Sequence, residues 1–257
     1  MDGNADTSGT RGGNGRKRVV KQRLESLASA GVSDLPKRRP GSARRTSGSL
    51  DSGAAAGGAK VPQPIAVDAG SRRGTLDLLR QEVAACCLCE PLARARTQTV
   101  FGVGTATARL CFLGEAPGAD EDASGEPFVG RAGQLLTKII EACTLSRDEV
   151  YILNVLKCRP PENRPPLAEE TANCRGYFEK QLEIIAPEFI CCLGTTAAQA
   201  LLQTDEPIGK LRKRWFSWRN SQVICTYHPS YLLRNPPAKR EVWDDMKLLM
   251  AKLGVQL

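Results

Sequence analysis

Four cysteines constrain this chain more than any other feature of its sequence. They are Cys86, Cys89, Cys158 and Cys174, and the intervals between them hold 2, 68 and 15 residues. A metal centre bound by all four would fasten a tight turn to two distant segments. Four thiolates suit an iron–sulfur cluster or a structural zinc ion. Because the chain has a single histidine, His228, a zinc site with two cysteines and two histidines is excluded.

The first 73 residues differ in composition from the rest of the chain. They are rich in Gly, Ser, Ala, Arg and Lys and poor in large apolar residues. Such a segment buries too little apolar surface to offset its ordering entropy, so we predict a disordered tail. It holds 14 Lys and Arg against 6 Asp and Glu, whereas the remainder has 22 of each. The excess charge favours a polyanionic partner such as nucleic acid, and a linker without a partner is the alternative.

The remaining residues, 74–257, are enough for one well-buried domain. No stretch of the sequence is long and apolar enough to span a bilayer, and the first residues lack the apolar core of a secretory signal. We therefore expect a cytoplasmic protein with no membrane contact. In that reducing compartment, cysteines bind metals more often than they form disulfides.

Short apolar runs alternate with amphipathic stretches in this domain. The runs predict strands at 109–113, 150–156, 189–193 and 223–226, and the amphipathic stretches predict helices at 75–85, 132–143, 167–186, 195–202 and 241–253. This alternation predicts an α/β fold, a three-layer α/β/α sandwich with a mainly parallel central sheet. In such sheets the ligand lies at the carboxyl ends of the strands, where the unusual sequence of this chain is found.

The other six cysteines have simpler interpretations. Cys111, Cys191, Cys192 and Cys225 fall in predicted buried strands, and Cys143 falls on the apolar side of a helix. There, a free cysteine behaves as a small apolar residue. Cys87 lies between two proposed metal ligands and could replace Cys86, although it would then form only a C-x-C pair with Cys89.

Three blocks of sequence follow the predicted strands. The first runs from Gly114-Glu-Ala-Pro-Gly to Gly133 and leads into a helix. The second is Asn154-Val-Leu-Lys-Cys-Arg-Pro-Pro-Glu-Asn, and the third is His228-Pro-Ser-Tyr-Leu-Leu-Arg-Asn-Pro. Glycines in the first block let the backbone approach a ligand closely, but the block lacks the G-K-[ST] of a phosphate-binding P-loop.

Together with the cysteine spacing, these blocks closely resemble the family 4 uracil-DNA glycosylases, the iron–sulfur type found in many bacteria and archaea. The resemblance covers roughly residues 75–253. It implies hydrolysis of the N-glycosidic bond of deoxyuridine in DNA, which releases uracil and leaves an abasic site for base excision repair. It also implies a structural [4Fe–4S] cluster on Cys86, Cys89, Cys158 and Cys174, with zinc in the same ligands as the alternative.

The resemblance further implies the roles of individual residues. His228 matches a hydrogen-bond donor to the developing uracil anion, and Glu115 matches an acid that orients water or offsets positive charge on the sugar. Phe128 matches the aromatic residue that stacks on the flipped base, and Asn154 matches the amide that reads its edge. The remaining residues implied to border the uracil are Gly114, Ala116 and Glu121, the last with a helix-capping role as its alternative.

For DNA contacts, the resemblance implies a wedge and phosphate-binding cations. The loop Leu232-Leu233-Arg234 matches the apolar wedge and cation of the family, with burial of the leucines in the core as the alternative. Lys157 and Arg159 are expected to contact phosphate. We expect a monomer that acts on uracil-containing DNA at the nucleoid, with a tail that contacts DNA or other repair and replication proteins.

One departure from the family pattern and two alternative functions complete the prediction. Lys213 stands where the family pattern has glycine. A related branch becomes covalently attached to abasic DNA, but it has Gln where Ala116 stands and a basic insertion that is not evident here, so we expect turnover. A DNA-binding or crosslinking uracil sensor without turnover is the main alternative. An iron–sulfur redox protein unrelated to DNA is the other.

Overall fold

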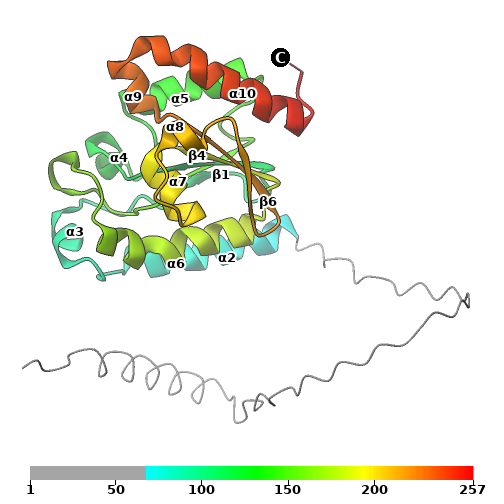
Figure 1. Ribbon diagram of the computed structural model, residues 1–257. Coiled ribbons are helices and arrows are strands. Elements are labelled where there is room, and N and C mark those ends of the chain that lie inside the picture. Colours follow the sequence, from blue (N-terminus) through cyan, green and yellow to red (C-terminus); the bar gives the residue numbers. More distant parts are fainter. Residues whose placement is uncertain (1–67, 257) are drawn as a thin grey trace, which may run out of the picture. The chain divides into compact units, whose positions relative to one another are not determined.

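The computed structural model describes residues 68–256, and Figure 1 labels helices α2 to α10 and some of the strands. The predicted disordered tail, residues 1–73, lies outside these residues except at its last positions. There its boundary is wrong, because helix α2 (Ala69–Ala84) already includes residues 69–73. Arg72 Nη1 donates a hydrogen bond of 2.5 Å to the main-chain oxygen of Ile185, which fastens the first turn of α2 to the domain.

In the described residues, six strands form one sheet in the order β1-β3-β2-β4-β6-β5. The strands are β1 (Val103–Gly104), β2 (Leu110–Gly114), β3 (Tyr151–Asn154), β4 (Phe189–Leu193), β5 (Trp215–Trp218) and β6 (Ser221–Thr226). The four central strands pair in parallel, and β1 and β5 pair antiparallel at the two edges. The predicted, mainly parallel sheet is confirmed, whereas the two edge strands were not predicted.

Helices cover both faces of the sheet, which confirms the three-layer α/β/α arrangement (Figure 1). One layer contains α2, α6 (Ala168–Ile185) and α7 (Thr195–Leu202), and the other contains α5 (Arg131–Ala142), α9 (Pro229–Arg234) and α10 (Lys239–Leu253). The shorter helices are α3 (Glu90–Ala95), α4 (Ala119–Ser124) and α8 (Ile208–Leu211), with 3-10 turns at Pro161–Asn163 and Pro236–Ala238.

The central strands are apolar on both faces because both faces are covered. Along β2, Cys111 and Leu113 pack toward α2 and α6, while Leu110 and Phe112 pack toward α5 and α10. Alternate side chains of a strand point to opposite faces, so a strand covered on both sides reads as a continuous apolar run. The predicted core cysteines are confirmed: Cys111, Cys143, Cys191, Cys192 and Cys225 are all buried.

The register of the sheet brings the motif blocks to one edge. Gly114, the last residue of β2, lies opposite Asn154, the last residue of β3. Leu193 at the end of β4 lies opposite Thr226 at the end of β6. The segments that leave these four strands therefore start side by side at the carboxyl edge.

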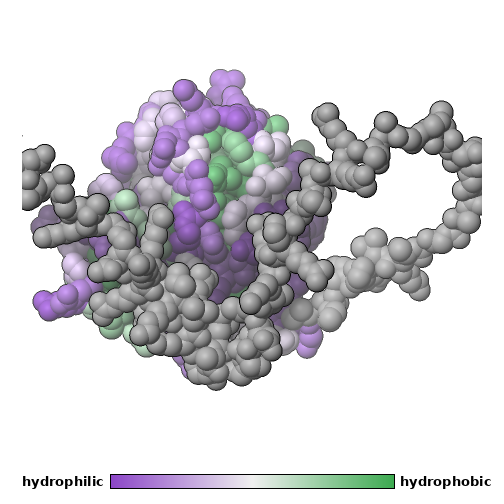
Figure 2. All heavy atoms as spheres, turned by 60° about the horizontal axis from the view of Figure 1, so that its bottom comes forward, coloured by the Kyte–Doolittle hydropathy of each residue, from purple (hydrophilic) through white to green (hydrophobic). Residues whose placement is uncertain are grey.

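Figure 2 shows one face of the domain, on which hydrophilic residues surround a smaller hydrophobic area. No helix within residues 68–256 has a stretch both long and apolar enough to cross a lipid bilayer.

Lys213 adopts a φ of +59°, the left-handed region that favours glycine, so the backbone keeps the glycine-type turn despite the substitution.

Candidate active site

A cavity of about 200 Å³ opens at the carboxyl edge of the sheet. It lies where β2, β3 and β6 end, so its walls come from the three motif blocks. Six residues predicted to act on uracil line it: Glu115, Ala116, Glu121, Phe128, Asn154 and His228. The fold therefore brings together side chains that are more than a hundred residues apart in the sequence.

Glu115 directly follows β2 and is held in place by main-chain and side-chain contacts. Its main-chain oxygen accepts a hydrogen bond from the N–H of Leu156 at 3.0 Å. The hydroxyl of Thr196, in the first turn of α7, donates to Glu115 Oε2 at 2.5 Å. One carboxylate oxygen is thus occupied, and the other is left for a ligand in the cavity. Sequence reasoning missed Thr196, because no motif includes the turn between β4 and α7.

Phe128 and Gly114 fit together beneath the cavity. Phe128 is 6 % exposed, and its ring lies 5.5 Å from the His228 ring, centroid to centroid, at an angle of 35°. A Cβ atom on Gly114 would overlap both the Phe128 ring and Oδ1 of Asn154. Gly114 is therefore needed for close approach, because any side chain there would displace the aromatic ring and the amide together.

Asn154 ends β3 with its amide at the cavity. The residue is only 2 % exposed, yet its Oδ1 accepts no hydrogen bond from the described residues. A buried polar atom without a partner costs about 1–3 kcal/mol. Such an atom in the wall of a cavity indicates a ligand that supplies the missing donor.

His228 is held in one tautomer by its own loop. The main-chain N–H of Ser230 donates to His228 Nδ1 at 3.1 Å, and Ser230 Oγ lies 2.8 Å from the same nitrogen. Because Nδ1 accepts a hydrogen bond, the neutral ring has its proton on Nε2, which is then the available donor. Burial, with a smaller contribution from the positive charge of Arg234, lowers the pKa of His228 to about 4. The imidazole is therefore neutral at physiological pH.

Glu121 closes the loop of the first motif block. Its Oε1 accepts hydrogen bonds from the N–H groups of Val129 and Gly130, each at 2.9 Å, and its Oε2 accepts one from Gly118 at 3.0 Å. The carboxylate thus joins the two ends of the loop that contains Phe128. The sequence left two roles open for Glu121, shaping of the pocket and capping of a helix. This set of hydrogen bonds is compatible with both.

A buried ion pair supports the strand end before His228. Arg212 Nε donates to Asp245 Oδ2 at 2.8 Å, and the hydroxyl of Thr226 donates to the same oxygen at 2.6 Å. The guanidinium of Arg212 also lies 4.2 Å from the centroid of the Tyr227 ring. Through Asp245, helix α10 therefore holds the end of β6, which leads into the histidine loop.

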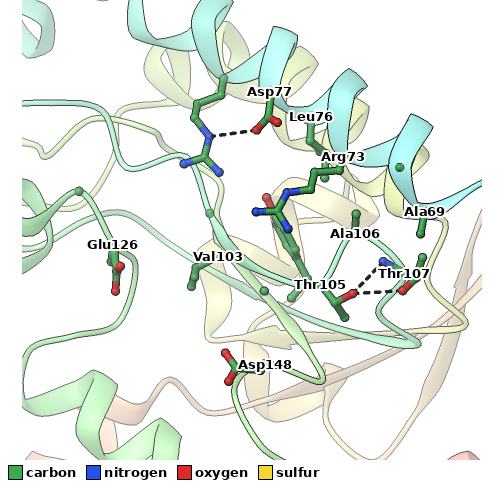
Figure 3. Close-up of a pocket in the computed structure, with 16 residues that line it drawn as sticks. Ala69, Arg73, Leu76, Asp77, Val103, Thr105, Ala106, Thr107, Glu126 and Asp148 are labelled. Carbon is green, nitrogen blue, oxygen red and sulfur yellow. Dashed lines mark hydrogen bonds and ion pairs between the residues drawn. The ribbon is translucent and has the colours of Figure 1, made fainter.

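A second, larger cavity of about 610 Å³ lies between α2 and the segment that includes β1 (Figure 3). Its polar side chains partly pair with one another, since Arg80 contacts Asp77 and the hydroxyls of Thr105 and Thr107 are 3.1 Å apart. None of the predicted site residues lines this cavity. The smaller cavity is therefore the candidate active site.

Comparison with known proteins shows the family of this chain. A family model described as the uracil DNA glycosylase superfamily matches residues 101–247. The type-4 uracil-DNA glycosylase of Archaeoglobus fulgidus is 42 % identical over 181 residues, which are 67 % of this chain and 90 % of that protein. The corresponding protein of Thermotoga maritima is 44 % identical over 167 residues, 64 % of this chain and 86 % of its own length.

The chain belongs to the type-4 uracil-DNA glycosylases. A type-5 uracil-DNA glycosylase of Pyrobaculum aerophilum is more distant, at 28 % identity over 198 residues, 62 % of this chain and 84 % of that protein. The family resemblance predicted from the motif blocks is confirmed. Membership of this family contradicts the alternative of a redox protein unrelated to DNA.

Of the four cysteines of the proposed type-4 cluster, Cys86 and Cys89 lie between α2 and α3, Cys158 lies in the segment after β3, and Cys174 lies in α6. Asn173 Nδ2 donates to Cys89 Sγ at 3.4 Å, and Arg96 Nη1 donates to Cys158 Sγ at 3.1 Å. Burial, opposed by Lys157 and aided by the neighbouring Cys158 and Cys89, raises the pKa of Cys174 to about 11. Within residues 68–256, however, no three His, Cys, Asp or Glu side chains are arranged so that they could hold a metal ion.

The donor chemistry around these cysteines nevertheless suits a thiolate-bound group. N–H donors and a cationic guanidinium pointing at sulfur stabilise thiolates, and such contacts surround iron–sulfur clusters.

Two predicted DNA contacts are wrong. Lys157 is 1 % exposed, and its ammonium donates to the main-chain oxygens of Asn154 and Phe101 at 2.7 and 3.3 Å, so it cannot reach a phosphate. Leu232 is also 1 % exposed and packs with α5 and α10, as its structural alternative predicted. A residue that is already part of the core cannot act as a wedge between bases.

The other predicted DNA contacts remain available at the surface. Leu233 is 39 % exposed, and Arg234 next to it is exposed. Arg159 is half-buried and donates through Nε to Asn163 Oδ1 at 2.8 Å. Asn163 and Arg164 also line the cavity, so the second motif block continues from the site to the surface.

Proposed function

We propose that the cavity bounded by Glu115, Asn154 and His228 is where this type-4 uracil-DNA glycosylase hydrolyses the N-glycosidic bond of deoxyuridine. The enzyme excises uracil from DNA and leaves an abasic site. A base inside the duplex cannot reach a cavity of this kind, so the nucleotide must first be flipped out of the stack.

The observation that supports the substrate assignment is the unpartnered Oδ1 of Asn154. Uracil presents an N3–H donor beside the O4 acceptor, and one amide can accept from the former and donate to the latter. Cytosine presents the reverse pattern and would leave both amide groups unpaired. Because the amide is buried, such a mismatch costs more than it would in water.

His228 and Glu115 are suited to the bond-breaking step. As the bond to the sugar breaks, negative charge develops on uracil and positive charge on the sugar. The neutral His228, with its proton on Nε2, would donate to O2 of the departing uracil and stabilise the anion. Glu115, with Oε2 held by Thr196, would orient the attacking water through its other oxygen, and its charge would offset the cationic sugar.

We further propose that Cys86, Cys89, Cys158 and Cys174 bind a [4Fe–4S] cluster. The support is their free thiols, the donors pointing at the sulfurs of Cys89 and Cys158, and membership of the type-4 family. The cluster would supply structural cross-linking between α2, β3 and α6 and take no part in hydrolysis.

The DNA-facing surface would consist of Leu233 as the wedge and Arg234 and Arg159 as phosphate contacts. The basic residues of the tail would add a sequence-independent attraction to DNA, or contact other repair and replication proteins. We propose that the enzyme acts as a monomer, and in the cytoplasm at the nucleoid, where its substrate lies.

Release of free uracil is the decisive experiment. The iron-replete protein is incubated with single-stranded and double-stranded DNA containing one uracil, and abasic sites are then cleaved with alkali. We expect multiple turnovers, a slow His228→Ala variant, and loss of the preference for uracil over cytosine in Asn154→Ala. A covalent complex that survives denaturing gels, with no more than one uracil released per enzyme molecule, would instead show a crosslinking sensor.

A further inference from the structure

Phe128 has an unfavourable backbone conformation. Its φ is +57°, in the left-handed region, which is unfavourable for a bulky side chain. The residue is nevertheless buried, with its ring against Gly114 and His228. Surrounding contacts must therefore impose this conformation, because the loop would relax from it if left free.

The guanidinium of Arg147 makes those contacts. Arg147 lies in the turn between α5 and β3, outside all three motif blocks. Its Nη2 donates to the main-chain oxygen of Pro127 at 2.9 Å, and its Nη1 donates to that of Phe128 at 3.2 Å. Nη1 also lies 3.2 Å from the hydroxyl of Thr137 in α5, which fixes the guanidinium itself.

These two carbonyl groups define the conformation of Phe128. The carbonyl of Pro127 belongs to the peptide before the Phe128 Cα atom, and the carbonyl of Phe128 belongs to the peptide after it. Holding both at once limits φ and ψ of that residue together. A planar guanidinium can do this with donors on separate nitrogen atoms in a fixed fork, whereas a lysine ammonium presents its donors from one nitrogen atom and cannot reproduce that geometry.

Helix α5 supports the loop from the other side. A Cβ atom on Gly133 would overlap the main-chain carbon and oxygen of Phe128, so the helix and the loop are in direct backbone contact. The loop is thus held between α5 and Arg147. The half-buried position of Arg147 shields these hydrogen bonds from competing water.

We propose that Arg147 is a positioning residue for base recognition, which locks Phe128 in the conformation that presents its ring to the flipped uracil. This inference rests on the proposed role of Phe128 as the stacking residue. Stacking acts on the bound base before and during bond breaking, so its loss should weaken binding and leave the chemical step nearly unchanged.

The test compares Arg147→Met and Arg147→Lys with the parent enzyme on single-stranded uracil-containing DNA. We expect KM, and the inhibition constant of free uracil, to rise about tenfold in both variants, within the range for one stacked base. We expect kcat to stay within about twofold. Arg109→Met is the matched control, because Arg109 is exposed and pairs with Glu188 at the opposite end of β2.

A double-mutant cycle with Phe128→Leu separates positioning from a general structural role. If Arg147 acts through Phe128, the double variant should bind uracil no more weakly than Phe128→Leu alone. Losses that multiply, or an unchanged KM in Arg147→Lys, would overturn the inference. A parent enzyme that released no uracil would instead overturn the proposed function. Arg147→Lys keeps the charge, so it remains informative if Arg147→Met fails to fold.

Discussion

The side-chain amine of Lys157 donates a hydrogen bond of 2.7 Å to the main-chain oxygen of Asn154, so a buried donor supports the residue proposed to read the base. We expect Lys157→Met to lower the free energy of unfolding by about 1–3 kcal/mol, because the bonded carbonyl groups lose their donor. Chemical denaturation measures this change.

The same variant should leave the salt dependence of DNA binding unchanged, since Lys157 does not reach the surface. Arg159→Gln is the comparison: the slope of log K against log salt should fall by about one, the effect of losing one phosphate contact. A similar fall in Lys157→Met would mean that the lysine reaches DNA after all.

The single histidine makes the pH dependence of this enzyme simple to measure. The pKa of His228 is about 4 in the folded protein, against an ordinary value of 6.5. Between these values, the unfolded chain binds a proton that the folded protein does not, so protonation favours unfolding. We expect the stability contributed by the neutral ring to be complete above pH 6.5 and to fall by about 3 kcal/mol as the pH drops to about 4.

Comparison of the parent protein with His228→Asn isolates this contribution from those of the carboxylates. Because the sequence has one histidine, NMR of its ring nitrogens gives one set of signals to titrate. The signals should show a proton on Nε2 and titrate near pH 4. Titration near pH 6.5 would contradict the burial of this ring.

Gly114→Ala should abolish most activity without unfolding the domain. The added methyl group would overlap both the Phe128 ring and the amide of Asn154, so neither could keep its place in the cavity. We expect kcat/KM for uracil release to fall by about a hundredfold or more, as for other displacements of positioned groups.

Gly176→Ala is the matched control. A Cβ atom at this position of α6 meets no other atom within 4 Å. It should leave activity unchanged and raise stability by about 0.5–1 kcal/mol, because alanine favours a helix more than glycine does. Full activity in Gly114→Ala would show that the base does not bind where we place it.

Substitution of single cysteines tests the proposed cluster. Cys89→Ala and Cys174→Ala should lose bound iron and the visible absorption of the cluster, and should unfold at lower temperature. Cys87→Ala should retain both, because the Cys87 thiol is exposed and donates only to the main-chain oxygen of Ala85 among the described residues. Iron content, acid-labile sulfide and melting temperature measure these effects, and zinc in place of iron would support the alternative metal.

Removal of residues 1–67 tests the basic segment. This deletion is preferable to one ending at residue 73, because α2 begins at Ala69. We expect weaker DNA binding and a shallower salt dependence, with kcat for a short single-stranded substrate unchanged. Equal affinity with and without the segment would leave it the role of a linker.

The sheet was predictable because it depends on short-range patterns, whereas the expected site residues came from the resemblance of the motif blocks to a known family. The apolar runs that became β2, β4 and β6 are buried on both faces, and the polar residues that follow them meet at one edge. β1 has only two residues, and β5 lies at an edge, where pairing does not require a continuous apolar run.

Positioning residues were not predictable in the same way. Arg147 and Thr196 act through tertiary contacts with segments distant in the sequence, and neither lies in a motif. Lys157 and Leu232 show the converse: a family motif indicates a residue type at a position, but whether the side chain faces solvent depends on packing. Lys157 faces inward, where two main-chain carbonyl groups accept its hydrogen bonds.

Because helix α10 holds the strand end before His228, it is as important for the site as the motif blocks themselves. A premature stop codon ahead of residue 245 would remove the acceptor shared by Arg212 and Thr226, and would leave a guanidinium and a hydroxyl without their partner behind the histidine loop. Shortened products should therefore be inactive even though every motif is still translated. Fusion tags for purification or imaging should be joined beyond Leu253, so that the last helix stays intact.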